Sequence, residues 1–294
     1  MMKQALPAIA AVAALSHAAA SHASGVHLLM QKVVSSDVVQ LQVNNYASFD
    51  DFVDDNLASH SFAPTHFSAG FSVVELTSDP TGGYHLLMQK VVSGDVVQLQ
   101  VNNYASFDDF VDDKRASLSF APTHYSAGFS VVGLSSDPTG GYHLLMQKVV
   151  SSDVVQLQVN NYASFNDFVD DKRASLSFAP THFSAGFSVA GLSADPTGGY
   201  HLLMQKVVSS DVVQLQVNNY ASFDDFVDDN LVSRSFAPTH FSPGFSVAGL
   251  TFDLGDGQTD PDPMGGVPEP GTWGLLITGF GMAGAAIRRR RPCA

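Results

Sequence analysis

Hydrophobic and polar positions repeat along this chain with a fixed period of 58 residues. Within one period, residues 97–102 alternate between apolar and amide side chains, which predicts a strand with one apolar face. The apolar, β-branched segments 71–76 and 84–92 predict two further strands, joined by a turn at 78–83. A short reversal at 93–95 links the second and third strands. Each unit is therefore expected to contain a meander of three antiparallel strands.

After the meander the apolar spacing changes from two residues to three and four. Ser106 stands three residues before Asp109, and Phe107, Phe110 and Val111 follow the i, i+3, i+4 spacing of a helix. This pattern predicts a helix of about two turns that has a capping residue and acidic side chains in its first turn. An exposed loop and a connection to the next unit follow, with room for a fourth short outer strand.

Four such units fill the centre of the chain, at 27–84, 85–142, 143–200 and 201–258, and they are out of phase with its ends. The first meander starts directly at residue 27 and lacks the strand that precedes it in the other units. The last unit ends with such a strand at 245–250, and no meander follows it. If that extra strand pairs with residues 27–31, the two ends of the chain complete one shared unit and close a ring. Three or four antiparallel strands repeated four times predict an all-β, four-bladed propeller with a short helix in each repeat, because closure hides the sheet edges.

This architecture resembles the hemopexin type of propeller in its general arrangement only. The alternative is a linear array of small β-rich units, since 58 residues is also a suitable length for a stacked module.

The N-terminal residues 1–24 predict a secretory signal peptide. Lys3 precedes an apolar run at 5–15, and small residues suited to cleavage follow at 18–23. Residues 25–258 would then form the exported domain.

The C-terminal part contains a linker and a sorting signal. Residues 251–266 are acidic and rich in turn-forming residues, and they predict a linker that overlaps the end of the last unit. Residues 267–291 combine a Pro-Glu-Pro signature, an apolar stretch and an arginine cluster. The residues that carry this signal are Val267, Pro268, Glu269, Pro270, Trp273, Arg288, Arg289, Arg290 and Arg291. This order of parts resembles the PEP-CTERM sorting signal of Gram-negative bacteria.

The resemblance implies recognition by exosortase, a membrane protease-transpeptidase of bacteria that make exopolysaccharide. As a transmembrane helix, residues 271–287 would span roughly 25 Å, near the lower limit for a bilayer. The arginines at 288–291 would hold its end in the cytoplasm. We therefore expect a protein that is exported, anchored in the inner membrane through this helix before processing, and then placed at the cell surface or outside the cell.

Composition narrows the classes of function. The formal net charge of −14 argues against nucleic acid as a partner. The one cysteine, Cys293, lies beyond the arginines, so the repeats have no thiol for a disulfide, a metal thiolate or a nucleophile. No unit combines a nucleophile, a base and a group that orients the base. We therefore predict a non-enzymatic protein without a cofactor.

One histidine in each unit precedes the predicted innermost strand: His66, His124, His182 and His240. Loops at this position converge near the axis of a propeller, where four imidazoles could hold a transition metal. Ordinary loop histidines bonded to the backbone are the simpler explanation, because no second type of ligand accompanies them. Paired acids such as Asp108 and Asp109 could hold calcium, but helix capping explains them more simply.

One tyrosine in each unit ends the third strand: Tyr46, Tyr104, Tyr162 and Tyr220. These rings could stack on sugars if they are exposed at a propeller face, and packing in the core is the alternative. The leading hypothesis is a cell-surface or exopolysaccharide-matrix protein that binds glycans multivalently. A metal- or calcium-binding extracellular propeller is the alternative.

Overall fold

The computed structural model describes residues 25–35, 38–67, 70–93, 96–125, 128–151, 154–183, 186–209, 212–241 and 244–255. The predicted signal peptide and sorting signal lie outside these residues. The strands are β1 (Val26–Ser35), β2 (Val38–Tyr46), β3 (Ser59–Phe67), β4 (Ser72–Ser78), β5 (Tyr84–Ser93), β6 (Val96–Tyr104), β7 (Ser117–Tyr125), β8 (Ser130–Ser136), β9 (Tyr142–Ser151), β10 (Val154–Tyr162), β11 (Ser175–Phe183), β12 (Ser188–Ala194), β13 (Tyr200–Ser209), β14 (Val212–Tyr220), β15 (Ser233–Phe241) and β16 (Ser246–Phe252). The helices are α1 (Phe49–Val53), α2 (Phe107–Val111), α3 (Phe165–Val169) and α4 (Phe223–Val227).

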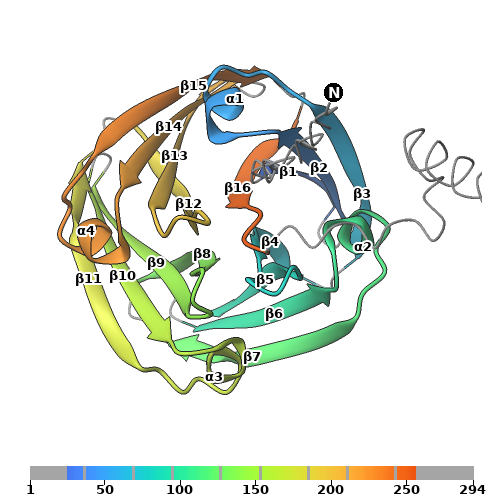
Figure 1. Ribbon diagram of the computed structural model, residues 1–294. Helices are drawn as coiled ribbons and strands as arrows, with labels where there is room; N and C mark the ends of the chain where they lie inside the picture. Colours follow the sequence, from blue (N-terminus) through green and yellow to red (C-terminus); the bar gives the residue numbers. More distant parts are fainter. Residues whose placement is uncertain are drawn as a thin grey trace, which may run out of the picture.

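The strands form four antiparallel sheets arranged around a central axis (Figure 1). We number the blades from the N-terminus. Blade 1 contains β16, β1, β2 and β3; blade 2 contains β4–β7, blade 3 contains β8–β11, and blade 4 contains β12–β15. In each blade the strand named first is innermost, because β4, β8, β12 and β16 contact one another around the axis. The predicted four-bladed propeller is confirmed, and its fourth strand is a full nine residues long.

Blade 1 is built from both ends of the chain. Strand β16 pairs with β1 so that Leu250 lies opposite Leu28, as the phase of the repeats predicts. The backbone N–H of Asp253 donates to the carbonyl oxygen of Gly25 at 3.0 Å beyond the last pair. The ring therefore seals itself with its own strands, and we call residues 25–255 the ring domain.

The hydrophobic core lies between the blades. Each blade places alternate residues on each of its two faces, and four apolar clusters fill the four junctions. Each helix packs against the outermost strand of the preceding blade, as α2 does against β3. Every blade therefore needs both neighbours to bury its apolar faces, which favours closure over a linear array.

The helices are shorter than predicted. Helix α2 spans five residues, and Ser106 caps it by accepting a hydrogen bond from the backbone N–H of Asp109 at 3.1 Å. Two residues after the helix, Asp113 adopts a positive φ of 53°, which the short carboxylate side chain tolerates. This left-handed residue turns the chain away, so the capping prediction is confirmed while the helix ends early.

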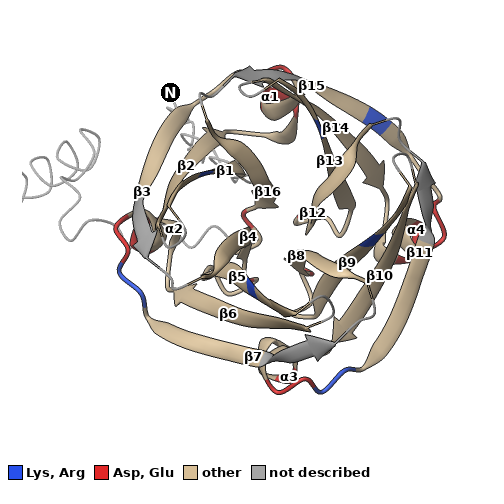
Figure 2. Ribbon diagram, turned by 180° about the vertical axis from the view of Figure 1, so that it is seen from behind, with Lys and Arg blue, Asp and Glu red and all other residues tan. Residues whose placement is uncertain are grey.

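The ring has two different faces. The strand β1 starts beside the chain ends and α1, and it finishes at the hairpin to β2. The other blades run in the same sense, so all four helices lie on one face together with Gly25 and Asp253, and we call it the helix face. The end of β1 and the start of β2 lie on the opposite face, as do the corresponding strand ends of the other blades, and we call this the hairpin face. Acidic side chains gather at the helices (Figure 2).

Hydroxyl groups hold the innermost strands together around the axis. Thr251 accepts from the N–H of Ser78 at 3.2 Å, and Ser135 accepts from the N–H of Ala194 at 3.1 Å. Thr77 accepts in the same way from the N–H of Ser136 in blade 3, at 3.4 Å. Because these groups are buried, the hydrogen bonds satisfy backbone donors that have no sheet partner on the axis side.

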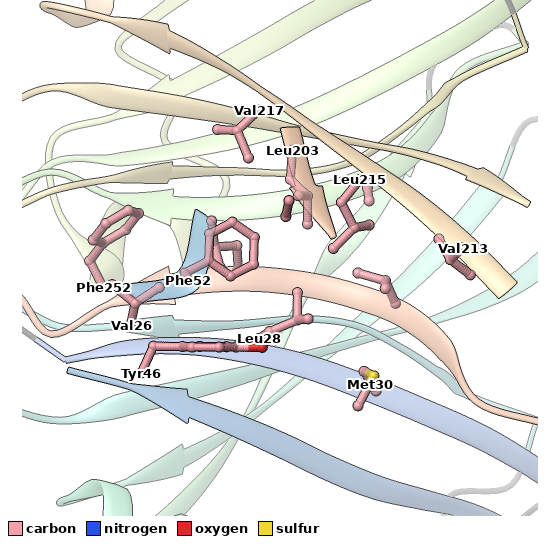
Figure 3. Packing of buried hydrophobic residues seen from close by; sticks show 14 residues of the cluster. Val26, Leu28, Met30, Tyr46, Phe52, Leu203, Val213, Leu215, Val217 and Phe252 are labelled. Carbon is pink, nitrogen blue, oxygen red and sulfur yellow. The ribbon is translucent and has the colours of Figure 1, made fainter. Parts of the chain in front are cut away.

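The junction where the ring closes has a different packing from the others. In blades 2, 3 and 4 a tyrosine on the second strand pairs with a small residue on the innermost strand, as Tyr200 does with Ala194. In blade 1 the sizes are reversed, and Val26 pairs with Phe252 (Figure 3). Phe252 stacks on His201 of blade 4 with ring centroids 4.6 Å apart. The phenylalanine thus fills from β16 the space that a tyrosine fills elsewhere.

Candidate functional site

The tyrosines proposed to stack on sugars lie in the core. Tyr104 is 2% exposed and packs edge-on against Phe110, with centroids 5.4 Å apart. Its hydroxyl donates to Asp113 at 3.2 Å. Burial, together with the charge of Asp113, raises the pKa of Tyr104 to about 12. Tyr46, Tyr162 and Tyr220 are equally buried. The helix that follows each tyrosine folds back over its ring, so these rings are covered and do not lie at a propeller face.

The histidines proposed as metal ligands lie in the outermost strands. His66 pairs with Val39 near the end of β3. His124, His182 and His240 hold the same position in β7, β11 and β15. Because the outermost strands lie on four sides of the ring, the backbone does not bring these residues together at the axis (Figure 1). Their side chains lie outside the description, and metal binding there stays a prediction.

The paired acids stand in the first turns of the four serine-capped helices. Asp109 and its equivalents stand in the first helical turn, where the serine before the helix accepts a hydrogen bond from their backbone N–H. Across the part of the chain that the structure describes, no group of three or more His, Cys, Asp or Glu side chains could hold a metal ion.

A polar network joins neighbouring blades on the helix face. His85 lies between two partners, with Nδ1 2.8 Å from Oδ1 of Asn103 and Nε2 3.3 Å from Oδ2 of Asp79. Tyr142 of the next blade donates to the same Asp79 oxygen at 2.5 Å. The imidazole stacks on Phe165, which also belongs to the next blade, with centroids 4.2 Å apart.

The contacts of the histidine with an asparagine and an aspartate are repeated in the other blades. His27 contacts Asn45 and Asp253, His143 contacts Asn161 and Asp137, and His201 contacts Asn219 and Asp195. Burial opposes ionisation of Asp79, but hydrogen bonds from His85, Thr81 and Tyr142 outweigh it and hold its pKa below the usual range. The four histidines are buried, and their contacts with these partners stabilise the blades.

The exposed candidate site lies on the outer part of each blade. In blade 2, Phe120 of β7 is 61% exposed and pairs with Gln100 of the neighbouring strand β6. Opposite residues of an antiparallel pair point to the same side, and so does Gln98, two residues before Gln100. Gln98 is exposed, and Nε2 of Gln100 donates to Oδ1 of Asn102 at 3.0 Å. An aromatic ring and two amides therefore lie on one side of the blade, and the ring and Gln98 are exposed there.

We call this arrangement the outer strip, and it occurs once in each blade. The corresponding residues are Phe62 with Gln40 and Gln42, Phe178 with Gln156 and Gln158, and Phe236 with Gln214 and Gln216. In these three blades the second glutamine is buried, so the exposed part of each strip is the phenylalanine and the first glutamine. Their phenylalanines are 61–65% exposed. The propeller directs the four outer strips to four different sides.

Sequence reasoning missed the outer strips although a signal was present. The phenylalanine stands between a serine and an alanine, and in an alternating outer strand the buried alanine implies that the phenylalanine faces outward. The prediction of a connection with only a short strand at 117–125 does not assign alternate residues of this segment to two faces of a sheet.

The C-terminal residues identify how the protein is handled by the cell. Residues 266–291 match the PEP-CTERM protein-sorting motif. The protein is therefore an exported one that exosortase sorts, as the Pro-Glu-Pro signature at 268–270 predicts. No curated protein is similar enough in sequence to match this chain. Among the described residues, no helix is long and apolar enough to cross a membrane, and the predicted membrane helix at 271–287 falls outside them.

Proposed function

We propose that this protein is a non-enzymatic component of the cell surface or exopolysaccharide matrix that binds neutral glycans through its four outer strips. The observation that carries the proposal is the repeated exposed phenylalanine beside amide side chains. The sorting motif supports a location where such polymers are the surrounding material.

The chemistry of the strip suits a sugar. The C–H face of a pyranose packs on an aromatic ring, and its hydroxyls both donate to and accept from amides, as the exposed side chain of Gln98 allows. A net charge of −14 opposes the approach of an anionic polymer, so the expected ligand is neutral.

The geometry of the ring favours cross-linking over enclosure of one ligand. The four strips face four sides, so a single short oligosaccharide reaches one of them, whereas separate polymer strands can occupy all four (Figure 2). Each strip is shallow and is expected to bind weakly, and the multiple attachment supplies the overall affinity.

The chain ends leave the strips accessible. Gly25 and Asp253 lie together on the helix face, where the linker toward the sorting motif departs. Neither residue lies at the perimeter of the ring, where the outer strips are.

The test is affinity electrophoresis of the ring domain through gels that contain neutral polysaccharide from the host. We expect retardation of the wild type and loss of retardation in the variant F62A/F120A/F178A/F236A. The matched control V33A/V91A/V149A/V207A removes equally exposed apolar side chains from the hairpin face and should be retarded like the wild type. Absence of wild-type binding at millimolar site concentration, or full retardation of the phenylalanine variant, would contradict the proposal.

A further inference from the structure

One position on the innermost strands breaks the repeat at the axis of the ring. It holds Glu75 in blade 2 and glycine in the other blades, at Gly133, Gly191 and Gly249. Glu75 is 1% exposed, and it is the only glutamate of the ring domain. No other residue of β4, β8, β12 or β16 is charged.

The glutamate side chain occupies the space that the three glycines leave open. A Cβ atom at Gly133 or Gly191 would overlap its carboxyl oxygens, and one at Gly249 would lie 2.8 Å from its Cγ. The carboxyl group thus reaches all three of the other blades. One large side chain and three missing ones together fill the axis.

The carboxyl group has one polar contact in its surroundings. Oε2 accepts a hydrogen bond from the backbone N–H of Leu134 at 2.8 Å, while Oε1 is buried and has no hydrogen-bond partner among the described residues. Removing a carboxylate from water costs free energy unless several hydrogen-bond donors or a cation replace the water. The neutral acid avoids most of this cost.

Charged groups on the adjacent strands are engaged elsewhere. On the second strands β1, β5, β9 and β13, each histidine contacts a turn aspartate on the helix face. Each lysine lies over a phenylalanine ring toward the hairpin face, with its Nζ 5.8–5.9 Å from the ring centroid. Lys90, for example, lies 5.9 Å from the centroid of Phe71. Glu75 itself pairs with Leu87 of β5.

We propose that Glu75 is kept as an uncharged carboxylic acid at the axis of the ring, and that loss of its proton loosens the contacts among the four innermost strands. Burial raises the pKa of this carboxyl group well above its usual value, and the hydrogen bond from Leu134 lowers it by less. The ring is therefore built to be tightest when Glu75 is protonated.

The proposal fixes the sign of the pH dependence. In the unfolded chain Glu75 ionises near 4.5, while in the folded ring it keeps its proton to higher pH. Between these two pKa values the folded state binds one proton more, so its stability falls as pH rises. The unfolding equilibrium constant should increase about tenfold per pH unit in that window.

The first test is carbon NMR of the ring domain labelled with ¹³C only in glutamate, where Glu75 gives a single carboxyl signal. We expect the signal of a neutral acid at pH 6, and its titration above that pH. A midpoint near 4.5 would overturn the proposal, and this measurement needs no variant that could fail to fold.

The second test compares urea unfolding of the wild type and E75Q between pH 5 and 8. Glutamine fills the same space without a titrating proton, so the tenfold change per pH unit attributed to Glu75 should disappear from E75Q. An unchanged pH dependence in E75Q would also overturn the proposal.

Discussion

The exchanged pair at the closing junction gives the sharpest test of ring closure. Phe252 is 2% exposed between Val26 and His201, and replacing it with alanine should lower the free energy of unfolding by about 3–5 kcal/mol, the usual cost of a phenylalanine cavity. Replacing Val26 with tyrosine in the wild type overfills the same space and should cost about 1–3 kcal/mol.

The double variant V26Y/F252A recreates the pair that Tyr200 and Ala194 form in blade 4. Its new hydroxyl would point toward Asp195, as that of Tyr142 does toward Asp79. We therefore expect the double variant to be within about 1 kcal/mol of the wild type, which amounts to a coupling of about 3 kcal/mol or more.

The assay is urea unfolding of the ring domain followed by far-UV circular dichroism, since its sequence has no tryptophan. The reverse exchange, A194F/Y200V, serves as a matched control and should be tolerated better than A194F alone. If the costs of V26Y and F252A simply add in the double variant, the two ends of the chain do not share this junction.

Three further outcomes follow from the contacts described above. Replacing Tyr142 with phenylalanine removes the donor to ionised Asp79 and should lower the free energy of unfolding by about 1.5–3 kcal/mol, measured by urea unfolding at pH 6. Replacing Ser106 with alanine should lower the free energy of unfolding by about 1 kcal/mol, because the N-cap hydrogen bond is lost. Threonine at the same position should keep most of this hydrogen bond, and thermal melts of S106A and S106T check both expectations. Hydrogen bonds lower the pKa of Asp79 below its ordinary 3.8, so the stability that ionised Asp79 supplies is complete above pH 3.8 and is lost as the pH falls further. The free energy of unfolding of D79N should therefore fall less between pH 4 and 2 than that of the wild type.

The phase of the repeats was sufficient to predict the propeller and its closure. When each end of a repeated meander has an unpaired strand edge, the simplest arrangement pairs the two ends with each other. The structure pairs residue 250 with residue 28 in this way. Capping by Ser106 was equally predictable because it depends on residues three apart. Local patterns of this kind act through short-range geometry that is visible in sequence.

The positions of aromatic and histidine side chains depended on contacts between blades and were harder to predict. Tyr104 is buried because α2 folds back over it, and His66 lies at the perimeter because β3 is a full strand where a loop was expected. The role of Glu75 requires knowing which residues of β4 face the axis. Its replacement by glycine in the other three units was the available signal.

The central claim is that the ring presents four equivalent outer strips that bind one type of polymer together. The most direct measurement is the affinity of ring domains with four, three, two or one intact phenylalanine for the polysaccharide and for a short oligosaccharide of the same sugar. We expect the affinity for the oligosaccharide, per intact strip, to stay constant, while the affinity for the polymer falls by about 10²-fold or more from four strips to one. A polymer affinity that falls only in proportion to the number of strips, or does not fall, would contradict the account.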